Sequence, residues 1–390
     1  MMLLENKTVA IVGGGPGGLT LTRLLQLKGV KVKLYERDLD RNARVQGGPL
    51  DMHEGSGLAA LTAAGLLEQF CTHFLPGADR TLIVNEQAAV FFSDHHDKQA
   101  KDLGELGFRP EIDRGALRKI LLDELEPGTV VWDSHFISMK AQGDGWSLDF
   151  ANGTRVYADL VIGSDGANSK IRPYVTDIKP LYSGITMIEG NVNDSESFTP
   201  EVHALLKGGK IMAFGKEQDL LMGQKGGGDL GFYASFKAEK DWHKNNGLDY
   251  SSNAAMLDWF NSTYVGWSKV WQKLFEQAVV PFIPRAINYM PLDQCWQALP
   301  NLTIVGDAAH LMPPFAGEGA NMAMLDALEL SACLTANDYS SMQLAIAAYE
   351  SAMLKRAAAA TRESLLNGER MHTVTALQEM TEIFSRHKKG

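Results

Sequence analysis

The segment Val9–Leu19, with the sequence VAIVGGGPGGL, joins a short apolar run to a turn that is rich in glycine. β-Branched residues dominate the apolar part, which predicts a buried parallel strand. Gly13, Gly15 and Gly18 fit the spacing G-x-G-x-x-G. The first glycine then permits a tight turn, the second lets a pyrophosphate approach the backbone, and the third lets the next helix lie close to the strand. The N-terminus of that helix offers free N–H groups to the phosphates.

A second strand supports this interpretation of the glycine-rich segment. Residues 30–35, VKVKLY, follow the predicted helix, and the run ends at Glu36. Glu36 lies 36 − 18 = 18 positions after Gly18, close to the roughly 20 at which an acid binds a ribose hydroxyl. Strand, turn, helix, strand and acid therefore occur in the order of a dinucleotide-binding unit. The alternative is an ordinary βαβ turn with a solvent-facing Glu36.

Composition restricts the class of protein. The chain has 390 residues, of which 45% are hydrophobic, and a formal net charge of −10. This charge argues against nucleic acid or an anionic membrane as the main partner. No run of about 18 apolar residues predicts a membrane span, and three widely spaced cysteines do not suit a disulfide framework. We therefore expect a cytoplasmic protein.

The pattern of helices and strands changes twice along the chain. We expect a discontinuous nucleotide-binding domain of residues 1–75, 105–178 and 298–338, and a β-rich domain of residues 76–104 and 179–297. Residues 339–390 are expected to form a C-terminal helix that bridges the two, with its helical run over 341–373. Further helices are expected over residues 55–70, from Asn168 and from about Gly319 to Ala336.

Two arginines near the glycine turn are candidates for cofactor contacts. Arg44 lies in a polar connection after Glu36, and we interpret it either as a phosphate contact or as part of a solvated surface run. Arg114 falls in the first turn of a helix that is entered through Asp113 as N-cap. A cation is unfavourable at that end of a helix dipole. The misfit indicates another role for Arg114, such as contact with the cofactor.

Two more motifs follow the first in order. They are Gly163-Ser164-Asp165-Gly166 and Gly306-Asp307-Ala308-Ala309-His310, the latter followed by Pro313-Pro314 and Gly317-Glu318-Gly319. Together the three motifs resemble the class A FAD-dependent monooxygenases of the aromatic-hydroxylase type. Segments 36–44, 48–51, 131–133 and 307–317 are most similar to the Tet(X)-type tetracycline-inactivating flavin monooxygenases. The resemblance covers nearly the whole chain. It implies an α/β fold with a Rossmann-like FAD-binding domain of the glutathione-reductase/aromatic-hydroxylase type, an inserted β-rich substrate domain and a long C-terminal helix.

The resemblance also implies the cofactors and their contacts. FAD would be bound with Glu36 on its ribose, Asp307 near the ribityl chain and the helix from Gly319 directed at the flavin ring, and NADPH would bind transiently. The implied cofactor-binding residues are Gly13, Gly15, Pro16, Gly17, Gly18, Glu36, Arg37, Arg44, Asp51, Arg114, Asp165, Gly166, Asp307, Pro314, Gly317, Gly319, Ala320 and Asn321.

The reaction implied by the resemblance is carried by the flavin. A C4a-hydroperoxide formed from reduced FAD and O2 would transfer oxygen to an electron-rich polycyclic enol or phenol, so no catalytic side chain and no metal ligand are predicted. The partners are then O2 and a small polycyclic substrate, and we expect a monomer. The implied substrate-binding residues are Glu189, Lys210, Met222, Gly231, Pro314, Phe315, Ala316, Gly317, Asn367 and Met371.

Three of these positions depart from the tetracycline-inactivating family. Its members carry Gln, Arg and His where this chain has Glu189, Lys210 and Gly231, and lysine does not replace the planar fork of arginine. The chain is therefore expected either to oxidise tetracyclines in a changed pose or to act on another polycyclic or phenolic compound. A related reductase and a non-catalytic flavin- or drug-binding protein remain as alternatives.

Overall fold

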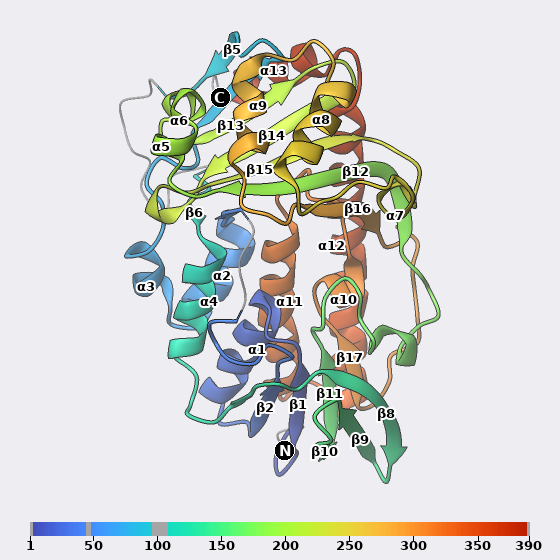
Figure 1. Cartoon of the computed structure of the whole chain (residues 1–390). Coiled ribbons are helices and arrows are strands. Elements are labelled where there is room, and N and C mark those ends of the chain that lie inside the picture. The colour runs from blue at the N-terminus through green and yellow to red at the C-terminus, as the bar shows by residue number, and fades with distance from the viewer. Residues whose placement is uncertain (1–2, 44–47, 96–107, 388–390) are drawn as a thin grey trace.

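The structure is a computed structural model that describes residues 3–43, 48–95 and 108–387. A five-stranded parallel sheet forms the centre of the lower half of the molecule in Figure 1. Its strands, in order across the sheet, are β17 (Leu302–Ile304), β11 (Leu160–Gly163), β1 (Val9–Val12), β2 (Val32–Tyr35) and β7 (Val130–Val131). All four residues of β1 are buried, as expected for a central parallel strand. The predicted strand–turn–helix unit is confirmed, because α1 (Pro16–Leu27) follows β1 directly.

Helices cover this sheet and a small antiparallel sheet extends it. α1 packs closely against α11 (Gly319–Thr335), where a Cβ atom at Gly17 would lie 2.8 Å from the backbone oxygen of Ala323. The other helices of this half are α2 (Ala59–Ala63), α3 (Leu67–Cys71), α4 (Arg114–Asp123) and α10 (Asp307–His310). The small sheet contains β10 (Arg155–Ala158), β9 (Gly145–Phe150) and β8 (Phe136–Gln142), and β3 (Leu50–Asp51) pairs with β6 (Glu111–Ile112).

A mixed seven-stranded sheet forms the upper half of the molecule (Figure 1). Its strands, in order, are β16 (Ile283–Tyr289), β12 (Leu181–Val192), β15 (Leu230–Lys237), β14 (Gln218–Gln224), β13 (Lys210–Phe214), β4 (Thr81–Asn85) and β5 (Val90–Ser93). Alternate residues of the inner strands pack in a core with α8 (Asn253–Thr263) and α9 (Lys269–Gln277) on one face. The short helices α5 (Ser195–Phe198), α6 (Pro200–Leu206) and α7 (Trp242–Asn245) complete this half. Helix α13 (Ala376–His387) packs against part of the other face, and the rest of that face is turned toward the five-stranded half (Figure 1).

Helix α12 (Met342–Met371) runs along both halves (Figure 1). Near its start, the hydroxyl of Tyr349 donates to the backbone oxygen of Ile304 in the five-stranded sheet at 3.2 Å. Just past its end, the Nε2 atom of His372 lies 2.5 Å from the hydroxyl of Ser235 in the seven-stranded sheet. Because these contacts are buried, α12 fixes the two sheets relative to each other.

The local structure differs from the sequence-based expectation at four places. The expected helix over residues 55–70 is divided, because Gly65 adopts a positive φ of 73° between α2 and α3. No helix begins at Asn168, where Asp165 instead accepts hydrogen bonds that form a turn. Asp113 precedes α4 but does not cap it with its side chain, which accepts a hydrogen bond from the Gly226 N–H at 2.7 Å. The C-terminal helix ends at Met371, and a further helix, α13 (Ala376–His387), follows it.

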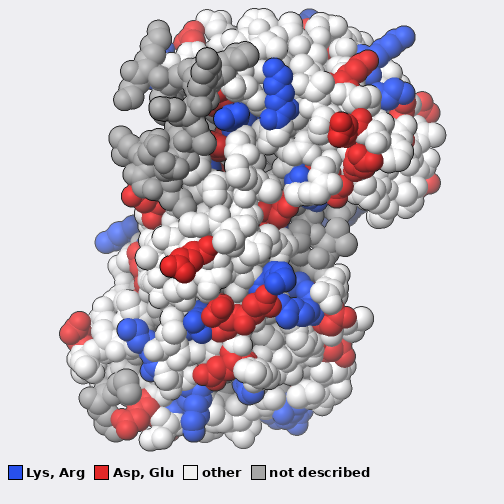
Figure 2. Space-filling model, turned by 90° about the vertical axis from the view of Figure 1, so that its left-hand side faces the viewer, with Lys and Arg blue, Asp and Glu red and all other residues white. Residues whose placement is uncertain are grey.

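The surface is mixed in charge on the face that Figure 2 shows. Lysine and arginine side chains alternate with aspartate and glutamate over both halves of that face. Within the described ranges, none of the helices is both long and apolar enough to span a lipid bilayer.

Candidate active site

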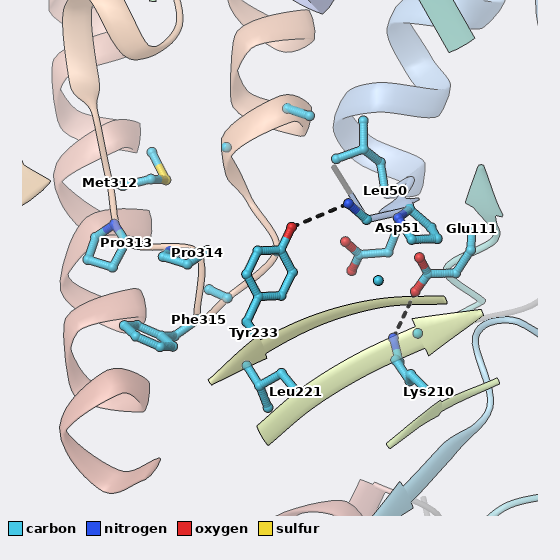
Figure 3. A pocket seen from close by; sticks show the side chains of 18 of the residues that line it. Leu50, Asp51, Glu111, Lys210, Leu221, Tyr233, Met312, Pro313, Pro314 and Phe315 are labelled. Carbon is cyan, nitrogen blue, oxygen red and sulfur yellow. Dashed lines mark hydrogen bonds and ion pairs between the residues drawn. The ribbon is translucent and has the colours of Figure 1, made fainter. Parts of the chain in front are cut away.

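A cavity of about 1730 Å³ connects the two halves of the molecule. It begins at the glycine turn after β1, passes the N-terminus of α11 and reaches the inner face of the seven-stranded sheet. The carboxyl ends of parallel strands are where α/β proteins place their ligands. Figure 3 shows part of this cavity, with the loop that contains Met312–Phe315 on one side and Lys210 and Glu111 on the other.

The glycine turn is closed on its protein side and open on its cavity side. Gly13 has a φ of 108°, and a Cβ atom there would lie 2.3 Å from the backbone oxygen of Ser164. A Cβ atom at Gly18 would lie 2.1 Å from the backbone oxygen of Gly13. At Gly15, by contrast, a Cβ atom would meet nothing within 4 Å. Gly15, Pro16, Gly17 and Gly18 all border the cavity, so the open side of the turn and the N-terminus of α1 face the same space.

Glu36 is buried at the end of β2, next to the glycine turn. Its carboxylate accepts hydrogen bonds from the backbone N–H groups of Gly14 and Asp38, the latter at 3.0 Å. The acid therefore lies beside the turn, as the sequence predicts. Arg37 is exposed, and it is not among the described residues that border the cavity. Arg44 lies outside the described residues.

The second motif contributes a turn to the cavity wall. Gly166 borders the cavity with a φ of 80°. Asp165 accepts hydrogen bonds from the hydroxyl of Ser169 at 2.5 Å and from the N–H of Lys170 at 2.7 Å. The Asp165 carboxylate thus shapes the turn that presents Gly166.

The third motif places a carboxylate and a helix N-terminus at the centre of the cavity. Asp307 borders the cavity, and burial raises the pKa of its carboxyl group. Gly319 and Ala320, the first residues of α11, border the same region, and Gly319 is close enough that a Cβ atom there would lie 4.0 Å from the Asp307 Oδ1 atom. The first N–H groups of a helix lack partners within the helix and are positive. This part of the cavity therefore favours a ligand with hydroxyls for Asp307 and a negative edge for α11.

Asn321, unlike the predicted cofactor-binding residues near it, is not among the described residues that border the cavity. Its side chain is buried, donates to the backbone oxygens of Asp51 at 2.8 Å and Gly317 at 3.2 Å, and accepts from the N–H of His53 at 2.9 Å. Asn321 thus joins the loop after β3 to the start of α11, while Pro314 and Gly317 border the cavity themselves.

A charged cluster that the sequence did not reveal lies at this junction. The Nε2 atom of His53 is 2.9 Å from the Asp51 Oδ2 atom, and its Nδ1 atom is 3.2 Å from the Glu318 Oε1 atom. Burial would lower the pKa of His53, but the two carboxylates outweigh this and raise it to about 9. Although burial opposes it, His53 and Lys210 lower the pKa of Asp51, which borders the cavity as a carboxylate. The spacing Asp51-x-His53 does not indicate a contact with Glu318, because Glu318 is distant in the sequence.

Arg114 and Tyr233 hold one residue from opposite sides. The Arg114 Nε–H donates to the backbone oxygen of Gly48 at 3.1 Å, and the N–H of Gly48 donates to the Tyr233 hydroxyl at 3.3 Å. Both side chains border the cavity, and Figure 3 shows the Tyr233 ring extending from the sheet toward Leu50. Tyr233, which the sequence did not single out, therefore links the seven-stranded sheet to the loop before Asp51.

All predicted substrate-binding residues border the cavity. They are Glu189, Lys210, Met222, Gly231, Pro314, Phe315, Ala316, Gly317, Asn367 and Met371. Met222 differs from the rest because its side chain packs in the hydrophobic core on the opposite face of the sheet. The Nδ2 atom of Asn367 donates to the backbone oxygen of Phe315 at 3.3 Å, which fixes α12 to the proline loop.

Two of these residues form ion pairs within the protein. The Arg285 Nη2 atom lies 2.5 Å from the Glu189 Oε2 atom, and the Lys210 Nζ atom lies 2.9 Å from the Glu111 Oε1 atom. Burial raises the pKa of Glu111. Although burial would lower the pKa of Lys210, the carboxylates of Glu111 and Asp51 raise it, so the ammonium group is retained. Arg285 and Glu111 belong to this site although the sequence did not indicate them.

Residues 3–43, 48–95 and 108–387 contain no group of three or more His, Cys, Asp or Glu side chains arranged to hold a metal ion. The polar groups in and beside the cavity suit an organic cofactor. The glycine turn is open to a phosphate and the N-terminus of α11 suits an anionic ring edge, whereas Glu36 lies buried beside the turn and is not among the described residues that border the cavity. FAD requires groups of these kinds.

Comparison with known proteins agrees with this donor set. The sequence profile described as "FAD binding domain" matches residues 6–179 and 298–364. The monooxygenase penA of Penicillium thymicola is 27% identical over 377 residues, which cover 83% of this chain and 83% of that protein. The 6-hydroxynicotinate 3-monooxygenase of Pseudomonas fluorescens is 26% identical over 377 residues, 92% of this chain and 91% of that protein.

Solved structures show the same fold at lower identity. HpxO of Klebsiella pneumoniae, complexed with FAD and uric acid, superposes with a TM-score of 0.76 at 19% identity and covers 97% of this chain and 94% of its own. The tetracycline destructase Tet(51) superposes with a TM-score of 0.74 at 17% identity, covering 98% and 95%. The predicted fold class is thus confirmed, and the likeness to tetracycline destructases is one of fold.

Proposed function

This chain belongs to the FAD binding domain family and is an FAD-dependent monooxygenase, and we propose that it inserts one oxygen atom of O2 into an electron-rich phenol or enol. The observation that carries this proposal is one continuous cavity that joins the glycine turn, Asp307 and α11 to the face of the seven-stranded sheet. Bound FAD supplies the reduction of O2 and the transfer of oxygen.

The chain's own residues hold the two reactants in this proposal. The turn at Gly15 and the N-terminus of α1 bind the pyrophosphate, with Glu36 on the ribose and Asp307 on the ribityl hydroxyls. The N-terminus of α11 stabilises negative charge on the pyrimidine edge of the ring. The substrate then faces three side chains of the sheet, Tyr233, Glu189 and Lys210. The loop at Pro314 closes the cavity on the opposite side and excludes water.

The reductant, the oligomeric state and the cellular location are also proposals. We infer that NADPH reduces the flavin in a transient encounter, and that the enzyme works as a cytoplasmic monomer. Size-exclusion chromatography and a comparison of NADPH with NADH as electron donors test these inferences.

A tetracycline is one candidate substrate, supported by the fold shared with Tet(51). A different phenol or enol is favoured by the two ion pairs, because Glu189 and Lys210 already bind Arg285 and Glu111 instead of presenting free polar groups. A ligand that binds Glu189 or Lys210 would have to displace the ion-pair partner of that residue, and breaking such a pair carries a desolvation cost. We therefore favour the second candidate and retain tetracycline as the reference compound.

The test is oxygen uptake and NADPH oxidation by the FAD-loaded protein, with and without tetracycline or simple phenols, together with product masses. A ligand-stimulated rate and a product about 16 Da heavier are expected for an accepted substrate. The combined variant Glu189→Gln, Lys210→Arg and Gly231→His, which restores the three groups of the tetracycline enzymes, is expected to bind tetracycline more tightly. Ligand-independent oxidation with every compound, and no heavier product, would contradict the proposal.

A further inference from the structure

The substrate end of the cavity has a polar part and an apolar part. The polar part contains the Lys210–Glu111 ion pair, Asp51 and Arg109. The apolar part lies farther along the same sheet, beneath α13. We call it the tail chamber, and it is formed by Phe92, Met212, Leu221, Phe315, Met371, Met380, Ile383 and Phe384.

Helix α13 builds one wall of the tail chamber. Its buried residues Ala376 and Met380 pack against Ile83 and Phe214 of the sheet. The rings of Phe384 and Phe92 lie 5.8 Å apart between centroids, which closes the far end. In Figure 1, α13 lies along the upper part of the sheet, beside β5 and β13. The wall is therefore a packed element of the fold.

A buried contact fixes the turn that leads into α13. The Nδ1 atom of His372 is 2.7 Å from the backbone oxygen of Gly368, and its Nε2 atom is 2.5 Å from the hydroxyl of Ser235. The ring of Phe315 packs edge-on against His372 with centroids 5.7 Å apart. The proline loop beside the flavin site and the start of α13 are thus held to one buried residue, and the tail chamber is continuous with the reaction site.

The side chains of the tail chamber indicate what it binds. Apolar groups that border a cavity favour an apolar ligand, since burying each methylene contributes about 0.8 kcal/mol. Three of the eight lining residues, Met212, Met371 and Met380, have unbranched side chains that adapt to an irregular or flexible partner. The charged residues of α12 that border the cavity, Glu363 and Arg370, are exposed to solvent. A flexible hydrocarbon group fits this lining better than a second polar ring does.

We propose that the substrate is an amphiphile, with a phenol or enol head beside the Lys210–Glu111 ion pair and a hydrocarbon tail in the tail chamber. The proposal rests on the proposed function for the identity of the head group. The tail chamber itself is defined by the fold and is tested by binding alone.

The first experiment measures the affinity of the FAD-loaded protein for phenols with 4-methyl, 4-butyl and 4-heptyl groups by isothermal titration calorimetry. We expect about fourfold tighter binding for each added methylene until the chamber is filled. Equal affinity for the three phenols would overturn the proposal.

Matched variants locate the effect. Met380→Gln keeps the length of a side chain that lines the chamber but adds a polar amide. We expect this variant to bind 4-heptylphenol about tenfold more weakly and to bind 4-methylphenol with unchanged affinity. Gln378→Met on the exposed side of α13 is the control and is expected to change neither affinity. Leu221→Gln repeats the test from the sheet if Met380→Gln does not fold.

An unchanged dependence on tail length in a folded chamber variant would overturn the proposal. Length-dependent binding without NADPH-dependent product would refute the proposed function and leave the tail chamber established.

Discussion

Lys210 and Glu111 form an ion pair across the boundary between the two halves of the molecule, with 2.9 Å between Nζ and Oε1. Lys210 begins a strand of the upper sheet, whereas Glu111 belongs to the short β3–β6 pair that also carries Asp51. The pair therefore connects the seven-stranded sheet to the strand pair that carries Asp51. In the proposed function, this ion pair would couple the substrate contacts of the sheet to the cofactor contacts of the loop.

A double-mutant cycle measures this coupling. Lys210→Met leaves Glu111 buried without its partner, and Glu111→Gln removes the charge that faces Lys210. We expect a coupling free energy of about 1–2 kcal/mol from urea unfolding at pH 7, because about a third of the lysine side chain (34%) remains accessible and its charge is partly screened. Additive effects of the two substitutions would show that the pair does not link the two halves.

His53 is expected to make stability depend on pH above neutrality. Its pKa is about 9 in the folded protein and about 6.5 when unfolded, because Asp51 and Glu318 face its two ring nitrogens. The contribution is thus fully present below pH 6.5 and is lost as the pH rises through 9. We expect the free energy of unfolding of the wild type to fall on the order of 2 kcal/mol over this range relative to His53→Gln. Parallel pH profiles in urea would contradict a protonated His53.

Arg114 is expected to contribute to FAD retention. Its Nε–H donates to Gly48 and its side chain borders the cavity. Burial raises the pKa of Asp307, and the charge of Arg114 opposes part of that rise. We expect Arg114→Ala to weaken FAD binding about tenfold, or 1.4 kcal/mol, measured by flavin fluorescence during titration of the apoprotein.

Lys119→Ala provides the control for this prediction. Lys119 lies on the same helix, is exposed and pairs with Asp123 away from the cavity. It is expected to leave FAD affinity unchanged. Equal flavin content of both variants after gel filtration would reject a cofactor role for Arg114.

The fold was predictable where the signals are local. The apolar run of β1, the glycine spacing and the helix after it lie in one short segment, and the structure confirms them. Helix α13 carried a signal that was missed, since Ala376, Met380 and Phe384 recur every four residues as on one helix face. The division of residues 55–70 was less accessible, because a single positive φ at Gly65 decides it.

The candidate site was predictable in its positions but not in its pairings. Glu189 and Lys210 border the cavity as expected, yet their partners Arg285 and Glu111 lie 96 and 99 positions away in the sequence. Such pairs depend on strand register and on how the two halves meet, and no local pattern contains that information. For the same reason, the sequence did not indicate the contact of Glu318 with His53 or the contact of Tyr233 with Gly48.

The two sides of the glycine turn are expected to respond differently to one added methyl group. Gly15 has an ordinary backbone conformation (φ −77°) and free space at Cβ, so Gly15→Ala is expected to leave the apoprotein's free energy of unfolding unchanged or slightly higher. The new methyl group points into the space assigned to the pyrophosphate, and FAD is expected to bind about tenfold more weakly. Gly18→Ala places Cβ 2.1 Å from the Gly13 oxygen, so it is expected to destabilise the apoprotein itself by more than about 2 kcal/mol.

Gly55→Ala is the matched control for both glycine variants, because a Cβ atom there also meets nothing within 4 Å and Gly55 does not border the cavity. It is expected to raise the free energy of unfolding by up to about 1 kcal/mol, because Gly55 is helical, and to leave FAD affinity unchanged. Thermal unfolding of the apoproteins separates folding from binding, and flavin titration of the folded variants then measures affinity. If Gly15→Ala bound FAD as tightly as Gly55→Ala, the phosphates could not lie against this turn. The assignment of the cofactor's position, on which Glu36 and Asp307 also depend, would then have to be abandoned.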